Sequence, residues 1–279
     1  MEVGNIVTRN SYNNDICFRI CELNNNIAIL KGTSFRLIAD ASIDDLNILS
    51  KKEYEIKEHD INKVMGNRLS SLIYECKNTN IFSRNNLDNL KKIGKILHID
   101  GDNYYLNKSI ENYNMLEIPA VGIYLNESEQ PEKIVSLLKE HNPSILIITG
   151  HDNLARGYNN WSDIDNYRNS KYFKESVEKA RIFNPNYDQL VIFAGGCQSY
   201  YEELIDAGAN FASSPNRTLI HHLDPVLLAY QIATTSIREF IDVEEAVKDT
   251  FGGMGGIGGM ETRGQSREIK PVFKNKKIY

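Results

Sequence analysis

The sequence is poor in the features that mark secreted, membrane-spanning and nucleic-acid-binding proteins. Its 279 residues include only 4 cysteines, 7 prolines and 1 tryptophan, and its formal net charge is −5. Four cysteines without zinc-finger spacing predict neither a disulfide framework nor a metal site. So few prolines argue against a long disordered region. The acidic balance indicates a surface that, as a whole, does not bind nucleic acid or anionic lipid.

Long hydrophobic runs are missing as well. No window reaches the ~18 to 20 apolar residues that a membrane-spanning helix requires, and the start, MEVGNIVTRN, lacks a secretion signal. We therefore expect a cytoplasmic protein that is not embedded in a membrane. With 41% hydrophobic and 25% charged residues, the chain has the composition of a folded protein with one large core and a small additional unit.

The first 50 residues carry short β-like segments separated by turn residues. Apolar and polar residues alternate within the segments, and Asn, Asp and Gly lie between them. We predict a small SH3-like β-barrel over residues 1–50, followed by one or two amphipathic helices over 51–90 that link it to the rest. The predicted strands are NIVTRN (5–10), DICFRICEL (15–23), NIAILKGT (26–33) and FRLIADA (35–41).

From residue 91 onward, apolar strands alternate with amphipathic helices. This pattern is typical of a parallel sheet covered by helices on both faces, and we predict an α/β domain over 91–279. In such sheets, ligands bind at the carboxyl ends of the strands. The predicted strands cover 95–102, 120–125, 144–152, 189–196 and 210–214, and the predicted helices cover 103–115, 131–141, 171–183 and 199–207.

Three of the predicted strands end in residues that can do chemistry. A cysteine nucleophile needs a basic partner that favours the thiolate, and a histidine at a neighbouring strand end can supply one. We therefore predict Cys197 as a nucleophile and His151 as its acid and base. Gly150 and Gly196 let backbone N–H groups approach a developing oxyanion, and we predict the N–H groups of Cys197 and of a residue beside His151 as the donors. The three strand ends read Asp100-Gly101-Asp102, Gly150-His151-Asp152 and Gly195-Gly196-Cys197.

Each of these residues also has an ordinary structural interpretation. A cysteine after a buried strand is often a small core residue, and Asp102 has the position of a helix N-cap. The adjacent His221 and His222 cannot share one face of a strand, so we predict no metal there, although they can line the site. No cofactor is predicted for this chain.

The two strand ends with His151 and Cys197 resemble the arrangement in caspase-like cysteine peptidases. Those enzymes usually place glycine after the histidine, whereas Asp152 follows it here. Most of the chain resembles the YabG family of sporulation-specific peptidases more closely. The segments that carry this resemblance, in order, are VGNIVTRNSYNNDICFRI, KILHIDGD, ILIITGHD, LVIFAGGCQS, AGANFASSP, HHLDPV and GGMETRG.

The family resemblance implies a caspase-like fold and a cysteine endopeptidase whose catalytic residues are Cys197 and His151. Its implied substrates are spore coat and cortex-related proteins, cut after arginine in the mother cell of a sporulating bacterium, where the enzyme associates with the forming spore coat. An arginine side chain removed from water needs a carboxylate, so the S1 pocket, which receives the residue before the cleaved bond, requires an acid. The candidates are Asp100, Asp102 and Asp152, and we favour the first two.

A glycine-rich segment, FGGMGGIGGMETRGQSRE (251–268), is predicted to be a mobile loop. An enzyme that cuts after arginine could cleave itself there, after Arg263 or Arg267; the simpler interpretation is a solvent-exposed loop.

A second function is consistent with the glycines and polar residues at the strand ends. In it, the chain is a noncatalytic spore-coat assembly protein whose α/β domain binds a small ligand and whose barrel recruits partners. Thiol-dependent peptide hydrolysis distinguishes the two.

Overall fold

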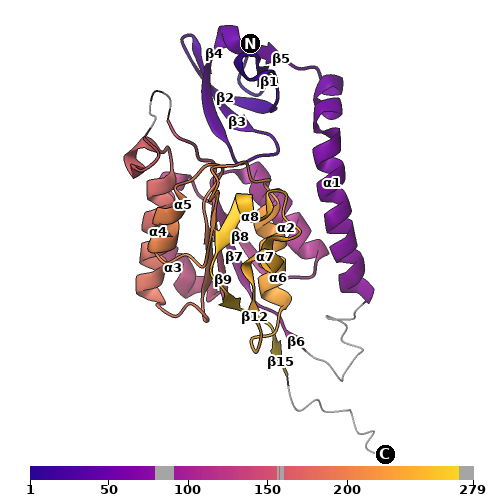
Figure 1. Ribbon diagram of the computed structural model, residues 1–279, viewed down its shortest axis with the longest axis vertical. Helices are drawn as coiled ribbons and strands as arrows, with labels where there is room; N and C mark the ends of the chain where they lie inside the picture. Colours follow the sequence, from indigo (N-terminus) through magenta and orange to yellow (C-terminus); the bar gives the residue numbers. More distant parts are fainter. Residues whose placement is uncertain (79–90, 156, 158–159, 270–279) are drawn as a thin grey trace, which may run out of the picture.

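Two main sheets and one long helix organise the structure (Figure 1). The computed structural model describes residues 1–78, 91–155, 157 and 160–269. The N-terminal sheet lies above a larger helix-covered sheet, and the long helix runs down one side of both (Figure 1). Within the described ranges, no helix is both long enough and apolar enough to cross a membrane.

The N-terminal sheet has five antiparallel strands in the order β4-β3-β2-β1-β5. Its inward side chains, such as Phe18, Ile20 and Leu30, are fully buried, as the alternation within the strands predicts. In this order the edge strands β4 and β5 are not paired with each other, so an SH3-like barrel is not confirmed. The strands are β1 (Ile6–Arg9), β2 (Phe18–Asn24), β3 (Ile27–Gly32), β4 (Ile38–Ser42) and β5 (Leu46–Ile48), with 3-10 turns at Asn10–Tyr12 and Ile43–Asp45.

The connection to the larger sheet contains a single helix, α1 (Lys51–Asn78). Its buried residues Met65, Leu69 and Leu72 belong to one hydrophobic cluster with residues of both sheets. The N-terminal sheet therefore shares its core with the α/β part. The predicted division into barrel, linker and peptidase domain stays a prediction, and residues 79–90 of the predicted linker lie outside the described residues.

The larger sheet has six strands in the order β13-β11-β10-β9-β7-β8. Five of them run parallel, and β13 pairs antiparallel with β11, so the sheet is mixed where we predicted a parallel one. The parallel strands lie where the sequence predicts them. The strands are β7 (Ile96–Asp100), β8 (Ala120–Tyr124), β9 (Ile145–Thr149), β10 (Val191–Ala194), β11 (Phe211–Ser213) and β13 (Ile257–Gly259).

Helices cover both faces of this sheet, and the alternation of side chains along its strands explains why. In β9, Ile145 and Ile147 face one hydrophobic cluster while Leu146 and Ile148 face another. The first cluster includes residues of α2, α6 and α7, and the second includes residues of α3, α4 and α5. The helices are α2 (Asn103–Met115), α3 (Gln130–His141), α4 (Ser170–Phe183), α5 (Tyr201–Asp206), α6 (Asp224–Thr234), α7 (Val243–Val247) and α8 (Gly253–Gly256), with 3-10 turns at Glu127–Glu129 and Ile164–Asn166.

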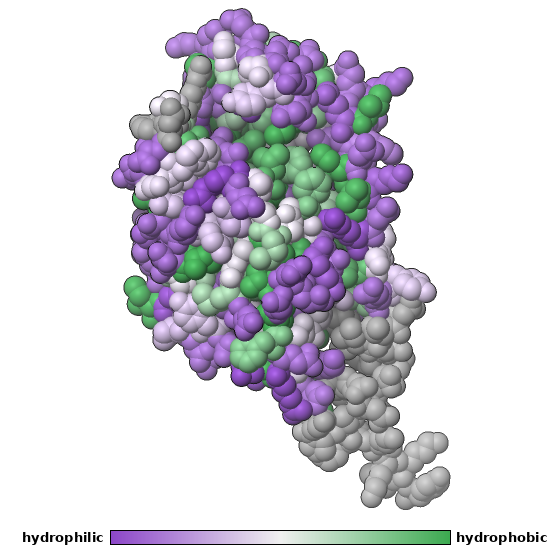
Figure 2. All heavy atoms as spheres, in the orientation of Figure 1, coloured by the Kyte–Doolittle hydropathy of each residue, from purple (hydrophilic) through white to green (hydrophobic). Residues whose placement is uncertain are grey.

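The glycine-rich segment is not the mobile loop that we predicted, because it forms α8, β13 and further short strands. Its glycines permit close packing: a Cβ on Gly258 would lie 2.9 Å from the Tyr201 hydroxyl, and one on Gly259 would lie 2.3 Å from the Asn210 carbonyl oxygen. Figure 2 shows hydrophobic residues gathered in the middle of this face, where α8 lies, between hydrophilic regions. The remaining short strands pair as β12 (Phe240–Ile241) with β14 (Thr262–Arg263), and β15 (Arg267–Glu268) with β6 (Lys91–Lys92).

Arg263 and Arg267, the two arginines considered for self-cleavage, therefore both lie in strands. The guanidinium of Arg263 stacks 4.2 Å from the centre of the Phe240 ring and forms an ion pair with Asp188. Arg267 lies opposite Lys92 in the β15–β6 ladder. Cleavage after these arginines stays a prediction, but it would have to open paired backbone.

The layered core makes a prediction for two matched isoleucines. Ile147→Ala in β9 should lower the free energy of unfolding by about 2–5 kcal/mol, because it leaves a cavity in the central strand. Ile182→Ala in α4 should change it by less than about 0.5 kcal/mol, since that residue is 84% exposed. Urea unfolding followed by circular dichroism measures both, and equal effects would contradict the layer assignment.

Candidate active site

The carboxyl ends of β7, β9 and β10 lie side by side, because these strands are neighbours in the sheet. Asp100 ends β7, His151 follows β9, and Cys197 follows β10. All three residues are fully buried. The structure thus brings together the strand ends that the sequence singles out.

Cys197 lies in a turn between β10 and α5. Gly195 before it has φ of +117°, a conformation that favours glycine. The thiol faces backbone, since the Ile220 N–H lies 3.3 Å and the Ile220 carbonyl oxygen 3.5 Å from Sγ. Burial raises the pKa of Cys197 to about 12. Helix α5 begins only at Tyr201, so Cys197 lies outside its first turn.

His151 is held by its backbone and by ring stacking. Its N–H donates to Glu127 Oε1 at 2.9 Å, and its ring stacks on Tyr105 at 5.2 Å between centres. Among the described residues, neither ring nitrogen has a hydrogen-bond partner, while Asp102 Oδ2 lies 3.9 Å from Nε2. Burial, with the nearby cations Lys31 and Arg36, holds the pKa of His151 well below its usual value. The ring is therefore neutral, and burial opposes its protonation while the site is closed.

Two backbone N–H groups converge on one carbonyl oxygen beside this pair. The N–H of Cys197 donates to the Arg36 carbonyl oxygen at 2.9 Å, and the N–H of Asp152 donates to the same oxygen at 3.2 Å. These are the N–H groups of Cys197 and of a residue beside His151, as we named them, while the Gly196 N–H instead donates to Ser199 Oγ. That they form an oxyanion hole stays a prediction. Gly196 still shapes the site, because a Cβ there would lie 3.3 Å from the Arg36 oxygen.

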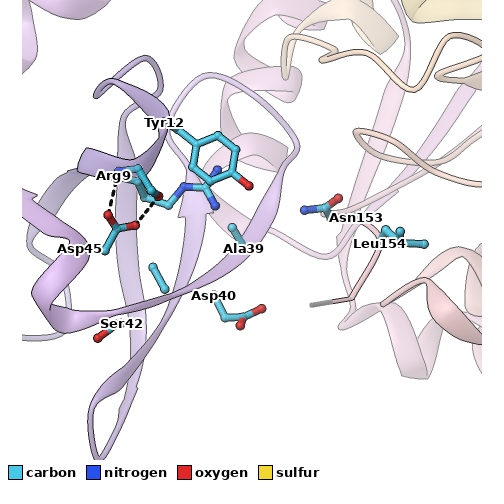
Figure 3. A pocket seen from close by; sticks show the side chains of 10 residues that line it. Arg9, Tyr12, Ala39, Asp40, Ser42, Asp45, Asn153 and Leu154 are labelled. Carbon is cyan, nitrogen blue, oxygen red and sulfur yellow. Dashed lines mark hydrogen bonds between the residues drawn. The ribbon is translucent and has the colours of Figure 1, made fainter. Parts of the chain in front are cut away.

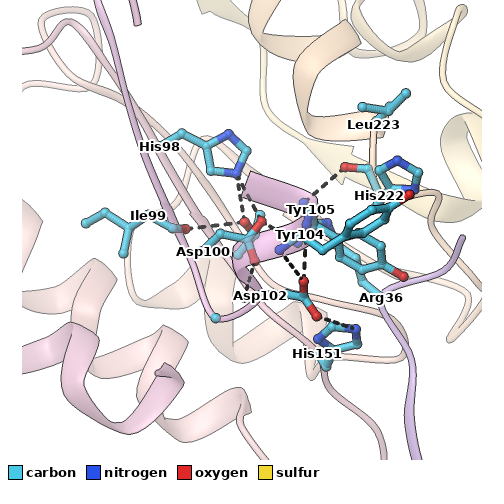
Figure 4. A network of polar contacts seen from close by, with 12 residues as sticks. Arg36, His98, Ile99, Asp100, Asp102, Tyr104, Tyr105, His151, His222 and Leu223 are labelled. Atoms are coloured by element: carbon cyan, nitrogen blue, oxygen red, sulfur yellow. Dashed lines mark hydrogen bonds and ion pairs between the residues drawn. The ribbon is translucent and has the colours of Figure 1, made fainter. Parts of the chain in front are cut away.

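The side chain of Arg36 reaches the end of β7 (Figure 4). Its Nη1 lies 2.8 Å from Asp100 Oδ2, and both side chains are fully buried. Its Nη2 donates to the His222 carbonyl oxygen at 3.0 Å, and the guanidinium lies 5.2 Å from the Tyr105 ring centre. Burial opposes ionisation of Asp100, but the Arg36 guanidinium and the His98 ring outweigh it and hold the pKa of Asp100 well below its usual value. Asp100 is therefore an ionised carboxylate in contact with an arginine.

The other two acid candidates have different contacts. Asp102 is the N-cap of α2, accepting from the N–H groups of Tyr104 and Tyr105 at 2.9 and 3.1 Å, and it faces His151 (Figure 4). The Asp152 carboxylate accepts from Ser170 Oγ at 2.5 Å and Ser199 Oγ at 2.8 Å. Burial, partly offset by these bonds, raises the pKa of Asp152 to about 6. Of the three candidates, Asp100 is therefore the acid that forms an ion pair with the Arg36 guanidinium in the part of the chain that the structure describes.

Sequence reasoning missed Arg36. We predicted it as a strand residue of FRLIADA, whereas β4 begins at Ile38 and Arg36 lies in the preceding loop. A signal was present, because an arginine between Phe35 and Leu37 interrupts an otherwise apolar run. His221 forms a β-bridge with Phe35, and the His222 N–H donates to the Ser34 carbonyl oxygen, so both lie beside the Arg36 loop. Their role as lining residues stays a prediction.

A cavity of about 560 Å³ opens beside the chain that follows Arg36 (Figure 3). The N-terminal sheet lines one side of it with Arg9, Tyr12 and residues 39–42, and Asn153 and Leu154 line the other. Asp40 on its wall is ion-paired with Arg168. This cavity therefore lies on the carboxyl side of the Arg36–Leu37 bond.

Comparisons with known proteins agree with the family resemblance seen in the sequence. The family model described as YabG peptidase U57 matches residues 2–271. A curated relative, the sporulation-specific protease YabG of Bacillus subtilis (strain 168), is 39% identical over 287 residues, covering 98% of this chain and 99% of the relative. No solved structure matches the chain. With nearly its whole length matched in both comparisons, the chain belongs to the YabG peptidase family.

Proposed function

We propose that this peptidase is a cysteine endopeptidase that cleaves after arginine, with Cys197 as the nucleophile and His151 as the acid and base. One observation carries the proposal: the N–H groups of Cys197 and Asp152 donate to the carbonyl oxygen of an arginine whose guanidinium is paired with Asp100. Two donors that converge on a carbonyl oxygen beside a thiol have the geometry of an oxyanion hole. A buried carboxylate is the partner that a desolvated guanidinium requires.

The reaction follows from these positions. His151 takes the thiol proton as Cys197 Sγ attacks the carbonyl carbon of the substrate arginine. The N–H groups of Cys197 and Asp152 stabilise the negative charge that develops on the carbonyl oxygen. His151 then protonates the departing amine, which leaves a thioester on Cys197. Water, activated by His151, hydrolyses the thioester and restores the thiol.

Asp102 supports His151 in this scheme. The carboxylate is fixed by the N-cap bonds at the start of α2 and lies 3.9 Å from the ring. An imidazolium that forms during the reaction is stabilised by a nearby negative charge. Cys197 and His151, both neutral at rest, can thus pass a proton without leaving a buried cation unpaired.

The family supports the biological setting of the proposal. The relative from Bacillus subtilis is named a sporulation-specific protease. We extend this to processing of spore coat and cortex-related proteins in the mother cell, where the enzyme would be cytoplasmic and would associate with the forming coat. The noncatalytic assembly function is tested by the same experiments.

The catalytic pair makes the first functional prediction. Cys197→Ala and His151→Ala should each reduce hydrolysis of an arginyl fluorogenic peptide at least about 10³-fold, because nucleophile and proton carrier act as a unit. The assay uses the full chain and an Arg36→Ala background, in which the S1 pocket is vacated.

The matched control for this assay is Cys76→Ala. Cys76 is also a buried cysteine, but its thiol contacts the Tyr230 hydroxyl at 3.2 Å between α1 and α6, away from the strand ends. That variant should retain activity. The noncatalytic function would be favoured by either of two results: hydrolysis that persists in both active-site variants, or no hydrolysis by any form of the protein.

Arginine recognition by Asp100 makes the second functional prediction. Asp100→Asn should lower the preference for an arginyl over a citrullyl peptide at least about 30-fold, or about 2 kcal/mol, because citrulline has a similar shape without the charge. The ratio of the two kcat/KM values measures this and is insensitive to a general loss of folded enzyme. The matched control is Asp163→Asn, because Asp163 is an exposed N-cap residue; this variant should leave the ratio unchanged. An unchanged ratio in Asp100→Asn would show that another group recognises arginine.

A further inference from the structure

The loop between β3 and β4 runs through the active site as an extended peptide. On one side it pairs with residues 220–222: the Arg36 N–H donates to the Ile220 carbonyl oxygen at 3.3 Å, and the His222 N–H donates to the Ser34 carbonyl oxygen at 2.9 Å. On the other side Leu37 forms an isolated parallel β-bridge with Asp152, and the Ile38 N–H donates to the Asp152 carbonyl oxygen at 3.4 Å. Backbone pairing of this kind is how extended peptides bind to proteins at a strand edge.

Arg36 occupies two subsites of this peptide path at once. Its carbonyl oxygen lies between the N–H groups of Cys197 and Asp152, and its guanidinium lies on Asp100. An ion pair that served folding alone would not require the arginine carbonyl to fill the oxyanion position. Arg36, His151 and Cys197 are all fully buried, so no other peptide can reach the thiol while this loop is in place.

We infer that the Arg36–Leu37 peptide bond is the enzyme's own first cleavage site; the inference rests on the proposed function. Cys197 Sγ adds to the Arg36 carbonyl carbon and its proton passes to His151. The C–N bond breaks, and Leu37 takes that proton to become a new amino terminus. Water then hydrolyses the Arg36 thioester, which yields the Arg36 carboxylate and the free thiol.

The fold holds both fragments after the cut. Strand β3 pairs with β4 from Ile27↔Ser42 to Lys31↔Ile38, and β1 pairs with β5, so residues 1–36 remain bound to residues 37–279 through two ladders. To leave, the loop must break its pairing with residues 220–222, the contacts of the Arg36 side chain, and the bonds from the Tyr105 hydroxyl to the carbonyl oxygens of Gly32 and Phe35. Self-cleavage thus frees the end of the loop and opens the S1 pocket while the sheet stays assembled.

The test is cell-free synthesis of the full chain, followed by intact-mass spectrometry and N-terminal sequencing. We expect the wild type to convert to fragments 1–36 and 37–279, with a rate independent of protein concentration over a tenfold range, because the reaction is intramolecular. Cys197→Ala should stay intact. Arg36→Gln should also stay intact, and the matched variant Arg19→Gln, on the neighbouring strand β2, should still be cut after Arg36.

The outcomes separate this inference from the proposed function. If wild type stays intact at Arg36–Leu37 while wild type or Arg36→Ala hydrolyses an arginyl peptide, self-cleavage is wrong and the proposed function stands. If neither reaction occurs in any form, both are wrong. A cut after Arg36 that persists in Cys197→Ala would assign the cleavage to another protease and overturn the inference. The decision rests on wild type and Cys197→Ala, so it holds even where Arg36→Gln does not fold.

Discussion

The buried ion pair between Arg36 and Asp100 is the interaction on which the arrangement of the active site depends. Neither charge has contact with solvent, and removing one partner from such a pair costs about 3–5 kcal/mol because the other is left unpaired. Asp100 ends a central strand and cannot move without disturbing the sheet. The loop that carries Arg36 must therefore come to Asp100, and it brings the N-terminal sheet with it over the strand ends.

This closure determines the protonation state of the proposed catalytic groups, Cys197 and His151. Since water is excluded, burial raises the pKa of Cys197 to about 12 and holds the pKa of His151 below its usual value, so both are neutral. A thiolate forms more readily when a charged or hydrated environment surrounds it. Departure of the loop would admit water to both groups at the same time as it vacates the proposed S1 pocket. Access and nucleophilicity are in this way controlled by the same few contacts.

Small residues decide how closely the segments approach one another. Gly196 leaves room for the Arg36 carbonyl oxygen beside the N–H groups of Cys197 and Asp152, and Gly150 leaves room for Glu127, which fixes the backbone of His151. The glycine-rich segment that supplies β13 follows the same principle, because its strand lies against an aromatic ring and a backbone carbonyl. The many glycines there allow the strand to approach its neighbours closely. The prediction of a mobile loop, which rested on glycine content alone, was therefore wrong.

The sequence by itself determined the elements of the α/β sheet and the position of Cys197 and His151 at neighbouring strand ends. Short apolar runs with period-two alternation encode strands locally, and parallel strands place their carboxyl ends together. Only the tertiary structure decided that Arg36 fills the candidate site, that its carbonyl oxygen accepts from the N–H groups of Cys197 and Asp152, and that Asp100 is the acid that meets its guanidinium. These contacts join residues far apart in the chain, and an arginine within an apolar run carries no local mark of the carboxylate that will pair with it.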